Sequence, residues 1–361
     1  MAPQPRPGIL DIPIYKGGDA QSKAARVFKL SSNENPLGAS PAARAAYLEA
    51  VEKLPTYPDG HWDKLRQAIG ARYGLDPERI LCGCGSDEFL FTFARAYLNP
   101  GDEAIYTRYG FSIYPIATRQ AGGVPVIAEE TNLRADVDAI LSVVTPRTKI
   151  VFLANPNNPT GTYLTSADLR RLKAGLPPHV LLVLDAAYAE FVRRNDYSAG
   201  IELVAESDNV VMTRTFSKIY GLAAIRIGWC YAPQSVVDVF HRLRPPFNLS
   251  GPAIAAGAAA VADEKFLVDS VDFNTRELDK LHKGLSALGL VAAESVANFL
   301  LLRFPQTPGK SAQDADVFLR DRGLVARGMS SYGLADCLRL SVGPEEANDL
   351  VISALAEFMK S

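Results

Sequence analysis

Between Trp62 and about Leu249, short apolar runs alternate with stretches of helical pattern. Several runs are apolar at every position, which is typical of strands covered by helices on both faces of a sheet. The alternation predicts an α/β layer with a largely parallel sheet, in which ligands bind at the carboxyl ends of the strands. The expected strands are Ile80–Cys82, Glu103–Tyr106, Pro125–Ala128, Ile150–Leu153, Val180–Leu184, Val210–Thr213 and Ile227–Tyr231.

The pattern changes on both sides of this region. Residues 1–40 begin with many prolines and glycines and predict an arm that contributes to a smaller domain and to a dimer. A helix starting at Pro41 opens the large domain, expected at 41–250. The rest of the chain, 251–361, predicts a smaller α+β domain. It holds an alanine-rich helix, a long helical stretch to Leu288, strands at Phe299–Arg303 and Cys337–Ser341, and a last helix, Glu345–Met359.

One lysine, Lys218, lies in a largely apolar stretch just after Thr215 and Ser217, and Arg226 follows it. Apolar surroundings disfavour the charged amine and raise its nucleophilicity, as a lysine that binds an aldehyde requires. Hydroxyl groups and a guanidinium are suitable donors to a phosphate. An aldehyde and a phosphate on one ligand indicate pyridoxal phosphate. The alternative is a strand end with one solvent-reaching lysine and one paired arginine.

Asp185 follows the apolar strand Val180–Leu184, where a carboxylate needs a partner. A protonated pyridine nitrogen would be such a partner and would stay cationic beside it. Asn158 lies in a turn rich in Asn and Pro, and Tyr188 lies three residues after Asp185. Both side chains could reach the ring's phenolic oxygen. The alternative for Asp185 is a helix cap.

Two further places favour anions. Residues 83–88, Gly-Cys-Gly-Ser-Asp-Glu, join a strand to a helix, whose start suits a phosphate, although Ser86 could instead be a simple N-cap. Arg339 lies on an otherwise apolar strand, with Arg327 before it, and could bind a substrate carboxylate or form a structural salt bridge.

The composition argues against other classes of partner. The chain has 38 basic and 40 acidic residues without blocks of like charge, so a small molecule is favoured over nucleic acid. Its 4 cysteines show no metal-binding spacing, so no metal site is expected. The sequence has neither a signal peptide pattern nor an apolar run of membrane-spanning length, so we expect a cytoplasmic protein.

Taken together, the stretches NPNNPTG, DAAY and TFSK, followed by Arg226, resemble the fold-type I pyridoxal-phosphate aminotransferases in order and approximate spacing. Within them, IPIYKGG, SSNENPLG, YPDG, GCGSDE and YGLADCLRLSVG are similar to the histidinol-phosphate aminotransferases. The resemblance implies a three-layer α/β/α fold and a homodimer. It also implies transamination between L-histidinol phosphate and 2-oxoglutarate in histidine biosynthesis. The alternatives are an aromatic amino-acid aminotransferase or a decarboxylase of a phosphorylated amino acid.

The resemblance also implies individual roles. Lys218 would bind the cofactor covalently and move the proton, and Asp185 would pair with the pyridine nitrogen. Tyr109 would stack on the ring, and Tyr57 would arrive from the other subunit. The other cofactor contacts would be Ser86, Asp87, Asn158, Tyr188, Thr215, Ser217 and Arg226, and the substrate contacts Tyr15, Asn158, Arg327 and Arg339. The arm reads Ile-Tyr-Lys where many relatives have Pro-Tyr-Val, which bears on the role of Tyr15.

Overall fold

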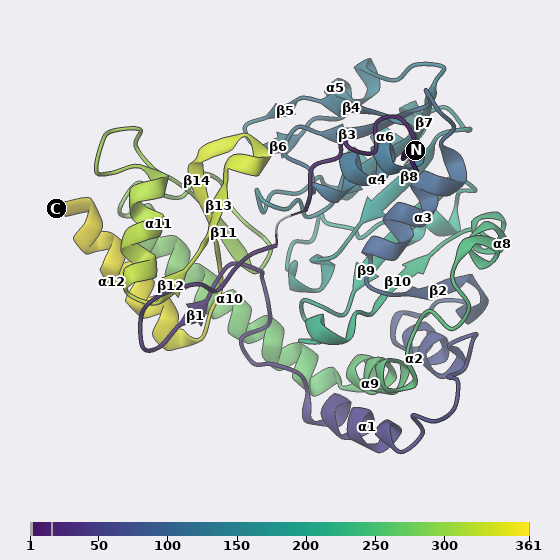
Figure 1. The fold of residues 1–361 in the computed structure, drawn as a ribbon, viewed down its shortest axis with the longest axis horizontal. Helices are drawn as coiled ribbons and strands as arrows, with labels where there is room; N and C mark the ends of the chain where they lie inside the picture. Colours follow the sequence, from purple (N-terminus) through teal and green to yellow (C-terminus); the bar gives the residue numbers. More distant parts are fainter. Residues whose placement is uncertain (1–2, 16, 361) are drawn as a thin grey trace.

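A seven-stranded sheet forms the centre of the computed structural model, which describes residues 3–15 and 17–360 (Figure 1). The strand order is β2-β10-β9-β8-β7-β3-β4, and β10 alone runs antiparallel to its neighbours β9 and β2. The expected mostly parallel sheet is therefore confirmed. Its strands are β2 (Ile80–Gly83), β3 (Glu103–Thr107), β4 (Val124–Ala128), β7 (Thr148–Ala154), β8 (Leu181–Asp185), β9 (Val210–Thr215) and β10 (Gly228–Tyr231).

Helices accompany this sheet, and the central strands β8 and β9 are buried along their whole length. Complete burial explains why these strands are apolar on both faces. The helices are α1 (Pro41–Val51), α2 (Asp63–Tyr73), α3 (Asp87–Tyr97), α4 (Ile113–Ala121), α5 (Val137–Ser142), α6 (Ser166–Gly175), α7 (Ile201–Ala205), α8 (Gln234–Leu243) and α9 (Gly251–Ala262), and a short hairpin pairs β5 (Glu130–Thr131) with β6 (Arg134–Ala135).

A smaller unit holds the C-terminal part of the chain. Its three-stranded antiparallel sheet has the order β11-β14-β13, and the long helix α10 runs beside it (Figure 1). The elements are α10 (Glu264–Ser286), β11 (Phe299–Arg303), α11 (Ala312–Asp321), β12 (Leu324–Val325), β13 (Arg327–Met329), β14 (Leu334–Ser341) and α12 (Glu345–Lys360). Among the residues described, no helix combines the length and the apolar character needed to cross a membrane.

The two hydrophobic cores favour a domain boundary later in the chain than the predicted one at residue 250. Helix α9 contributes Ala253, Ala256 and Val261 to the core of the large sheet and packs on α1 and α2 (Figure 1). Apart from Leu30 of the arm, the buried residues of the second core start within α10, at Leu278. We therefore propose that the large domain extends through α9.

The arm connects the two units. Near its start, Arg6 donates a hydrogen bond of 2.6 Å from Nη2 to the backbone oxygen of Gln120. Further on, β1 (Phe28–Lys29) pairs in parallel with β12, and Leu30 is buried in the second core (Figure 1). The part of the arm that follows residue 27 thus pairs and packs with elements of the C-terminal unit. Lys16, in the IPIYKGG stretch, lies outside the described residues.

Candidate active site

A cavity of about 340 Å³ lies where the carboxyl ends of β7, β8 and β9 meet the arm and the small domain. This is the edge of the sheet at which a parallel topology predicts ligand binding. The predicted residues that the structure brings to its wall are Tyr15, Ser86, Asp87, Asn158, Asp185, Tyr188, Thr215, Ser217, Lys218, Arg226, Arg327 and Arg339.

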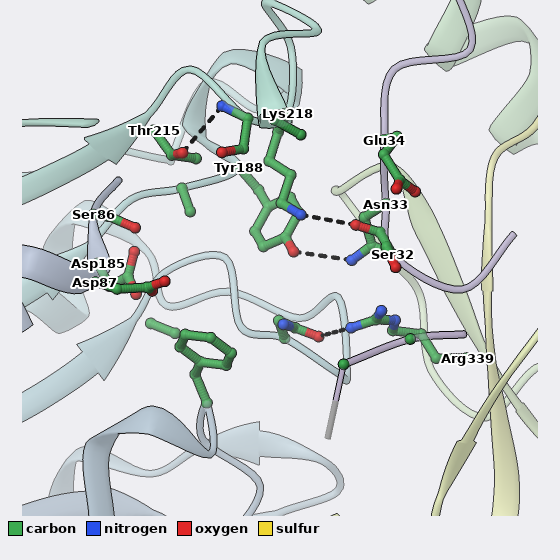
Figure 2. Close-up of a pocket in the computed structure, with 18 of the residues that line it drawn as sticks. Ser32, Asn33, Glu34, Ser86, Asp87, Asp185, Tyr188, Thr215, Lys218 and Arg339 are labelled. Carbon is green, nitrogen blue, oxygen red and sulfur yellow. Dashed lines mark hydrogen bonds between the residues drawn. The ribbon is translucent and has the colours of Figure 1, made fainter. Parts of the chain in front are cut away.

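Lys218 reaches into this cavity from the loop that follows β9. Its Nζ donates a hydrogen bond of 2.9 Å to the backbone oxygen of Ser32 on the arm (Figure 2). Burial, with the nearby guanidinium of Arg339 as the second cause, lowers the pKa of the lysine to about 8. The amine is therefore neutral in an appreciable fraction of molecules near neutral pH, as a nucleophile must be.

Asp185 is the last residue of β8, and its carboxyl group is buried at the cavity wall. One oxygen, Oδ2, accepts a hydrogen bond of 2.9 Å from the hydroxyl of Tyr114 on α4. The other, Oδ1, is buried and has no hydrogen-bond partner among the described residues. Burial raises the pKa of this carboxyl group to about 6. A carboxylate with one unpaired buried oxygen is suited to a cationic N–H donor.

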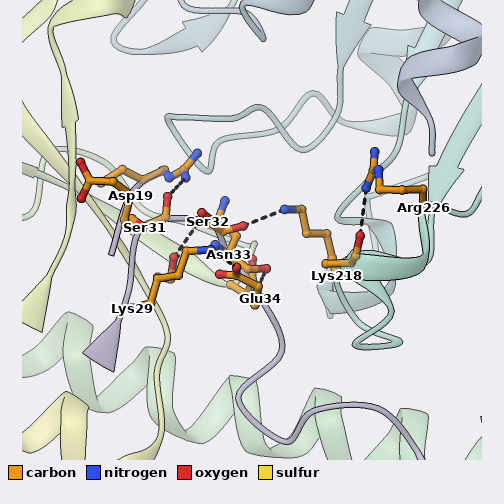
Figure 3. Close-up of polar contacts among 12 residues, drawn as sticks. Asp19, Lys29, Ser31, Ser32, Asn33, Glu34, Lys218 and Arg226 are labelled. Atoms are coloured by element: carbon orange, nitrogen blue, oxygen red, sulfur yellow. Dashed lines mark hydrogen bonds and ion pairs between the residues drawn. The ribbon is translucent and has the colours of Figure 1, made fainter. Parts of the chain in front are cut away.

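A group of polar side chains surrounds the start of α3. Ser86 occupies the N-cap position of α3, as the alternative predicts, but its hydroxyl makes no capping hydrogen bond to the helix. Arg226 donates from Nη1 to Ser217 Oγ at 3.3 Å (Figure 3), and its Nη2 lies 3.4 Å from the Asp87 carboxylate. The hydroxyl oxygen of Thr215 accepts from the backbone nitrogen of Ser217 at 3.0 Å. Hydroxyls, a guanidinium and a helix start together suit a phosphate.

Two glycines allow this close approach. A Cβ atom at Gly228 would stand 2.5 Å from the backbone carbonyl carbon of Gly85, and one at Gly85 would overlap the guanidinium of Arg226. Because real side chains do not pack so close to backbone atoms, β10 can lie against the start of α3 only with glycine at 228, while Gly85 has a φ of 79°, which favours glycine.

The small domain contributes Arg339, whose side chain is 2% exposed. Its Nη1 donates to Asn158 Oδ1, and its Nη2 donates to the backbone oxygen of Ser31 at 2.8 Å (Figure 2). The remaining nitrogen, Nε, is buried without a partner in the described part of the chain. Neither bond is to a carboxylate, so the expected alternative, a structural salt bridge, is not observed.

Tyr15 and Arg327 lie together at the mouth of the cavity, with the guanidinium 5.9 Å from the centre of the Tyr15 ring. An aromatic face and a guanidinium attract each other at this distance. The arm therefore brings a residue predicted to bind substrate next to one from β13.

Two predicted cofactor contacts lie outside the cavity. Tyr109 packs against a small hydrophobic cluster that includes Leu301 and Met329, whereas Phe111, two residues later, lines the cavity. We therefore propose Phe111 in place of Tyr109 as the residue that stacks on the ring. Tyr57 is 83% exposed and stacks on Phe247 at 4.7 Å, so this chain does not bring it to its own site.

Sequence reasoning missed other residues at the site, namely Ser32, Asn33, Phe111 and Tyr114. Asn33 donates a hydrogen bond to Tyr188, and Tyr114 donates to Asp185. The signal for Asn33 was the polar stretch SSNENPLG, which supported the resemblance but to which no site residue was assigned. Tyr114 had no comparable signal, since an aromatic residue at helical spacing is typical of a core.

Comparison with known proteins agrees with this geometry. The model of the family "Aminotransferase class I and II" matches residues 25–355. A histidinol-phosphate aminotransferase of Rhodopseudomonas palustris (strain BisA53) is 55% identical over 359 residues, which are 99% of this chain and 98% of that protein. A second, from strain HaA2, is 54% identical with the same coverage.

A solved structure is similar over the whole chain. The histidinol-phosphate aminotransferase from Sinorhizobium meliloti, crystallised in complex with pyridoxal-5'-phosphate, has a TM-score of 0.91 at 27% sequence identity and covers 100% of this chain and 98% of its own. The extent of the family match and the identity to these relatives together show that the chain belongs to the aminotransferase class I and II family.

Proposed function

We propose that this protein transfers the amino group between L-histidinol phosphate and 2-oxoglutarate in histidine biosynthesis, with pyridoxal phosphate as its cofactor. The relatives support the substrates, because the 55% identity to a histidinol-phosphate aminotransferase extends over nearly both chains. The observation that carries the proposal is that the half-buried amine of Lys218 and an unpaired buried carboxylate oxygen of Asp185 line one cavity.

The residues present fit pyridoxal phosphate. Asp185 Oδ1 lacks the donor that a protonated pyridine nitrogen would supply. Ser86, Thr215, Ser217 and Arg226 would hold the phosphate group at the start of α3. When bound, the cofactor supplies an electron sink that stabilises negative charge at the carbon bearing the substrate's amino group.

The chain's own groups then have separate tasks. Lys218 would hold the cofactor at its aldehyde carbon through Nζ, and its free amine would carry the proton to and from the substrate carbon. Asp185 keeps the pyridine nitrogen protonated through its carboxylate. Phe111 covers one face of the ring, while Asn158 and Tyr188 hold the phenolic oxygen. These residues orient the reacting groups, and the surrounding walls exclude water.

The substrate is recognised by cationic groups from the small domain and the arm. Arg339 would hold the α-carboxylate of L-glutamate and lie near the same side of histidinol phosphate. Arg327 and Tyr15 would meet the substrate phosphate, and the γ-carboxylate of glutamate in the other half of the reaction. A guanidinium suits both anions, because it presents paired donors to carboxylate and phosphate alike.

We also propose that the active protein is a cytoplasmic homodimer. Exposed apolar side chains are concentrated in the first sixty residues, among them Leu48 at 67%, Leu54 at 64% and Tyr57 at 83% exposure. A concentration of this kind marks an interaction surface. Tyr57 would cross that surface to the cofactor phosphate of the partner.

The proposed substrates can be tested by steady-state kinetics with purified, cofactor-loaded protein. We expect kcat/KM for L-histidinol phosphate to exceed that for L-phenylalanine. The variant Arg327→Ala should lower kcat/KM for histidinol phosphate about a hundredfold and change that for phenylalanine little, because a charged hydrogen-bonded contact is worth a few kcal/mol. Preference for phenylalanine, unaltered by Arg327→Ala, would instead identify an aromatic amino-acid aminotransferase.

A further inference from the structure

Asn33 is a fully buried residue of the arm whose contacts reach both domains. Its backbone nitrogen donates to Ser341 Oγ at 2.8 Å, and its backbone oxygen accepts from Asn298 Nδ2 at 3.0 Å. Its side-chain Nδ2 donates to the hydroxyl of Tyr188 at 2.9 Å (Figure 2). The residue has a φ of 59°, in the left-handed region that Asn adopts more readily than most residues. Three hydrogen bonds, two at the backbone and one at the side chain, thus hold Asn33 in place.

Ser341, at the end of β14, fixes which way the Asn33 amide points. The serine oxygen accepts from the backbone nitrogen of Asn33, and its single proton is donated to Asn33 Oδ1 at 2.8 Å. An amide oxygen can accept this proton, whereas an amide nitrogen cannot. The oxygen therefore faces Ser341, and the nitrogen must face Tyr188.

This orientation determines the direction of the hydrogen bond at Tyr188. Because Asn33 Nδ2 has no lone pair for an acceptor role, the tyrosine oxygen is the acceptor, and its own proton must point elsewhere. Tyr188 is on the cavity wall beside Asn158 and Lys218. Its proton is thus available to a ligand oxygen inside the cavity.

We propose that Asn33 is a positioning residue that makes Tyr188 a hydrogen-bond donor to the phenolic oxygen of pyridoxal phosphate, and that Ser341 of the small domain sets this direction. The inference rests on the proposed function, since it needs that cofactor in the cavity. It assigns a task to the SSNENPLG stretch and connects the small domain to Tyr188, the proposed donor to the cofactor ring, through two hydrogen bonds.

Other charged and titratable groups also face the Tyr188 side chain. Arg339 from β14 and Asp185 from β8 influence the Tyr188 hydroxyl electrostatically, and so does Tyr15 of the arm. The Lys218 ammonium lies 5.8 Å from the centre of the Tyr188 ring. The test below leaves all four unchanged and alters only the hydrogen bonds to Tyr188.

The experiment is a pH titration of the visible absorption band of the cofactor-loaded protein, which reports the proton shared between Lys218 and the phenolic oxygen. A hydrogen bond donated to this oxygen favours its deprotonated form. Asn33→Gly keeps the left-handed backbone but removes the amide, so the midpoint should rise by about one pH unit, a tenfold change in proton affinity. Ser341→Ala should raise it less, because it frees the amide to turn without removing it.

A double-mutant cycle separates this role from a structural one. Tyr188→Phe should itself raise the midpoint, and adding Asn33→Gly to it should cause no further rise. Asn298→Ala is the matched control, since Asn298 is 1% exposed and contacts only the backbone oxygen of Asn33 in this group. It should lower the melting temperature and leave the midpoint unchanged.

The outcomes distinguish the inference from the proposed function. A midpoint that Asn33→Gly does not move, or moves equally in the Tyr188→Phe protein, would overturn the role of Asn33 while leaving the transaminase intact. A wild-type protein that develops no visible band with pyridoxal phosphate would overturn the proposed function and this inference with it.

Discussion

Among single residues, Lys218 and Asp185 are two titratable groups whose burial lowers the stability of the cofactor-free protein. Burial lowers the pKa of Lys218 to about 8 and raises that of Asp185 to about 6. In each case the charged form is disfavoured, and a ligand that offers an aldehyde to the amine and a cation to the carboxylate relieves both. Perturbed groups that meet at one cavity are typical of catalytic sites.

Asp185→Asn should therefore have opposite effects on stability and on function. The folded-state pKa of about 6 lies above the ordinary 3.8, so the folded state binds the proton more tightly, and stability falls as pH rises through this window. At pH 8, Asp185→Asn should stabilise the cofactor-free protein by up to about 3 kcal/mol. It should also weaken cofactor binding and lower kcat about a hundredfold, because the partner of the pyridine nitrogen is lost.

Thermal unfolding of the cofactor-free wild type and Asp185→Asn variant at pH 4 and pH 8 measures the effect on stability. Titration with pyridoxal phosphate measures the effect on cofactor binding. At pH 4 the two proteins should differ less than at pH 8. A variant that is less stable than the wild type at pH 8 would contradict the account of Asp185.

Most of these site residues could be predicted from the sequence because each is unusual for its local surroundings. Lys218, Asp185 and Arg339 are charges in apolar stretches, and such positions need a reason. Phe111 and Tyr114 are aromatic residues at positions where a buried core residue is equally common. The sequence pattern therefore does not indicate whether Phe111 or Tyr109 lines the cavity. Only the packing of the α4 start decides which of them lines the cavity.

Among the secondary-structure elements, β10 and the start of α3 form the proposed phosphate-binding site, and they lie in close contact at Gly228. Gly228→Ala should push β10 from the start of α3 and cost about 1–3 kcal/mol of stability, the usual effect of overpacking. It should also weaken cofactor binding. Gly328→Ala on β13 is the matched control, because a Cβ there has no atom within 4 Å. Chemical denaturation and cofactor titration of both variants are the measurements, and equal behaviour of the two would contradict the close approach.

Beneath the site, a buried ion pair joins β9 to the turn that carries Tyr188. Arg214 Nη1 lies 3.0 Å from Glu190 Oε1, and the two side chains are 7% and 4% exposed. The guanidinium also lies over the rings of Tyr73 and Trp229. The pair thus connects the strand leading to Lys218 with the segment that follows Asp185.

Glu190→Gln should lower the free energy of unfolding by about 3 kcal/mol, because it leaves the Arg214 charge buried without compensation. Glu206→Gln is the control. It breaks a pair of the same 3.0 Å length with Arg170, but those side chains are 55% and 58% exposed, and its loss should cost less than about 1 kcal/mol. Similar losses from denaturant unfolding of the two variants would contradict the prediction.

The long elements of the large sheet were predictable, because burial makes most of their positions apolar, with the polar residues gathered at the carboxyl ends of β8 and β9. The two-residue strands β1 and β12 were not. Each is too short for a periodic pattern, and their pairing joins segments that are far apart in the chain. Helix α9 was predicted as a helix of the small domain, whereas we propose to include it in the large domain because it packs into the first core. An alanine-rich helix is small and apolar on every side and does not indicate what it packs against.

At the scale of the whole molecule, the two cores share one cavity, and the arm connects them. The Asn33 amide, the Ser32 backbone oxygen and the Ser31 backbone oxygen each accept or donate a bond at the cavity (Figure 3). Neither domain completes the site without the other, so motion of the small domain would change the contacts of Lys218, Tyr188 and Arg339 together.

The proposed dimer is tested by Leu48→Asp on α1. A charge at this exposed apolar position should disfavour association, so light scattering should find a mass near the 39.0 kDa of one chain where the wild type gives twice that. Val317→Asp on α11, at a position 54% exposed, should leave the dimer unchanged. A wild-type protein with the mass of one chain would contradict the dimer.

The central claim is that one amine, on Lys218, holds pyridoxal phosphate beside the Asp185 carboxylate. The most direct measurement is to load the purified protein, reduce it with borohydride, digest it and locate the modified lysine by mass spectrometry. We predict the pyridoxyl phosphate adduct on the peptide that contains Lys218 and no adduct in Lys218→Ala. An adduct on another lysine of the wild type, or no adduct after loading, would contradict the account.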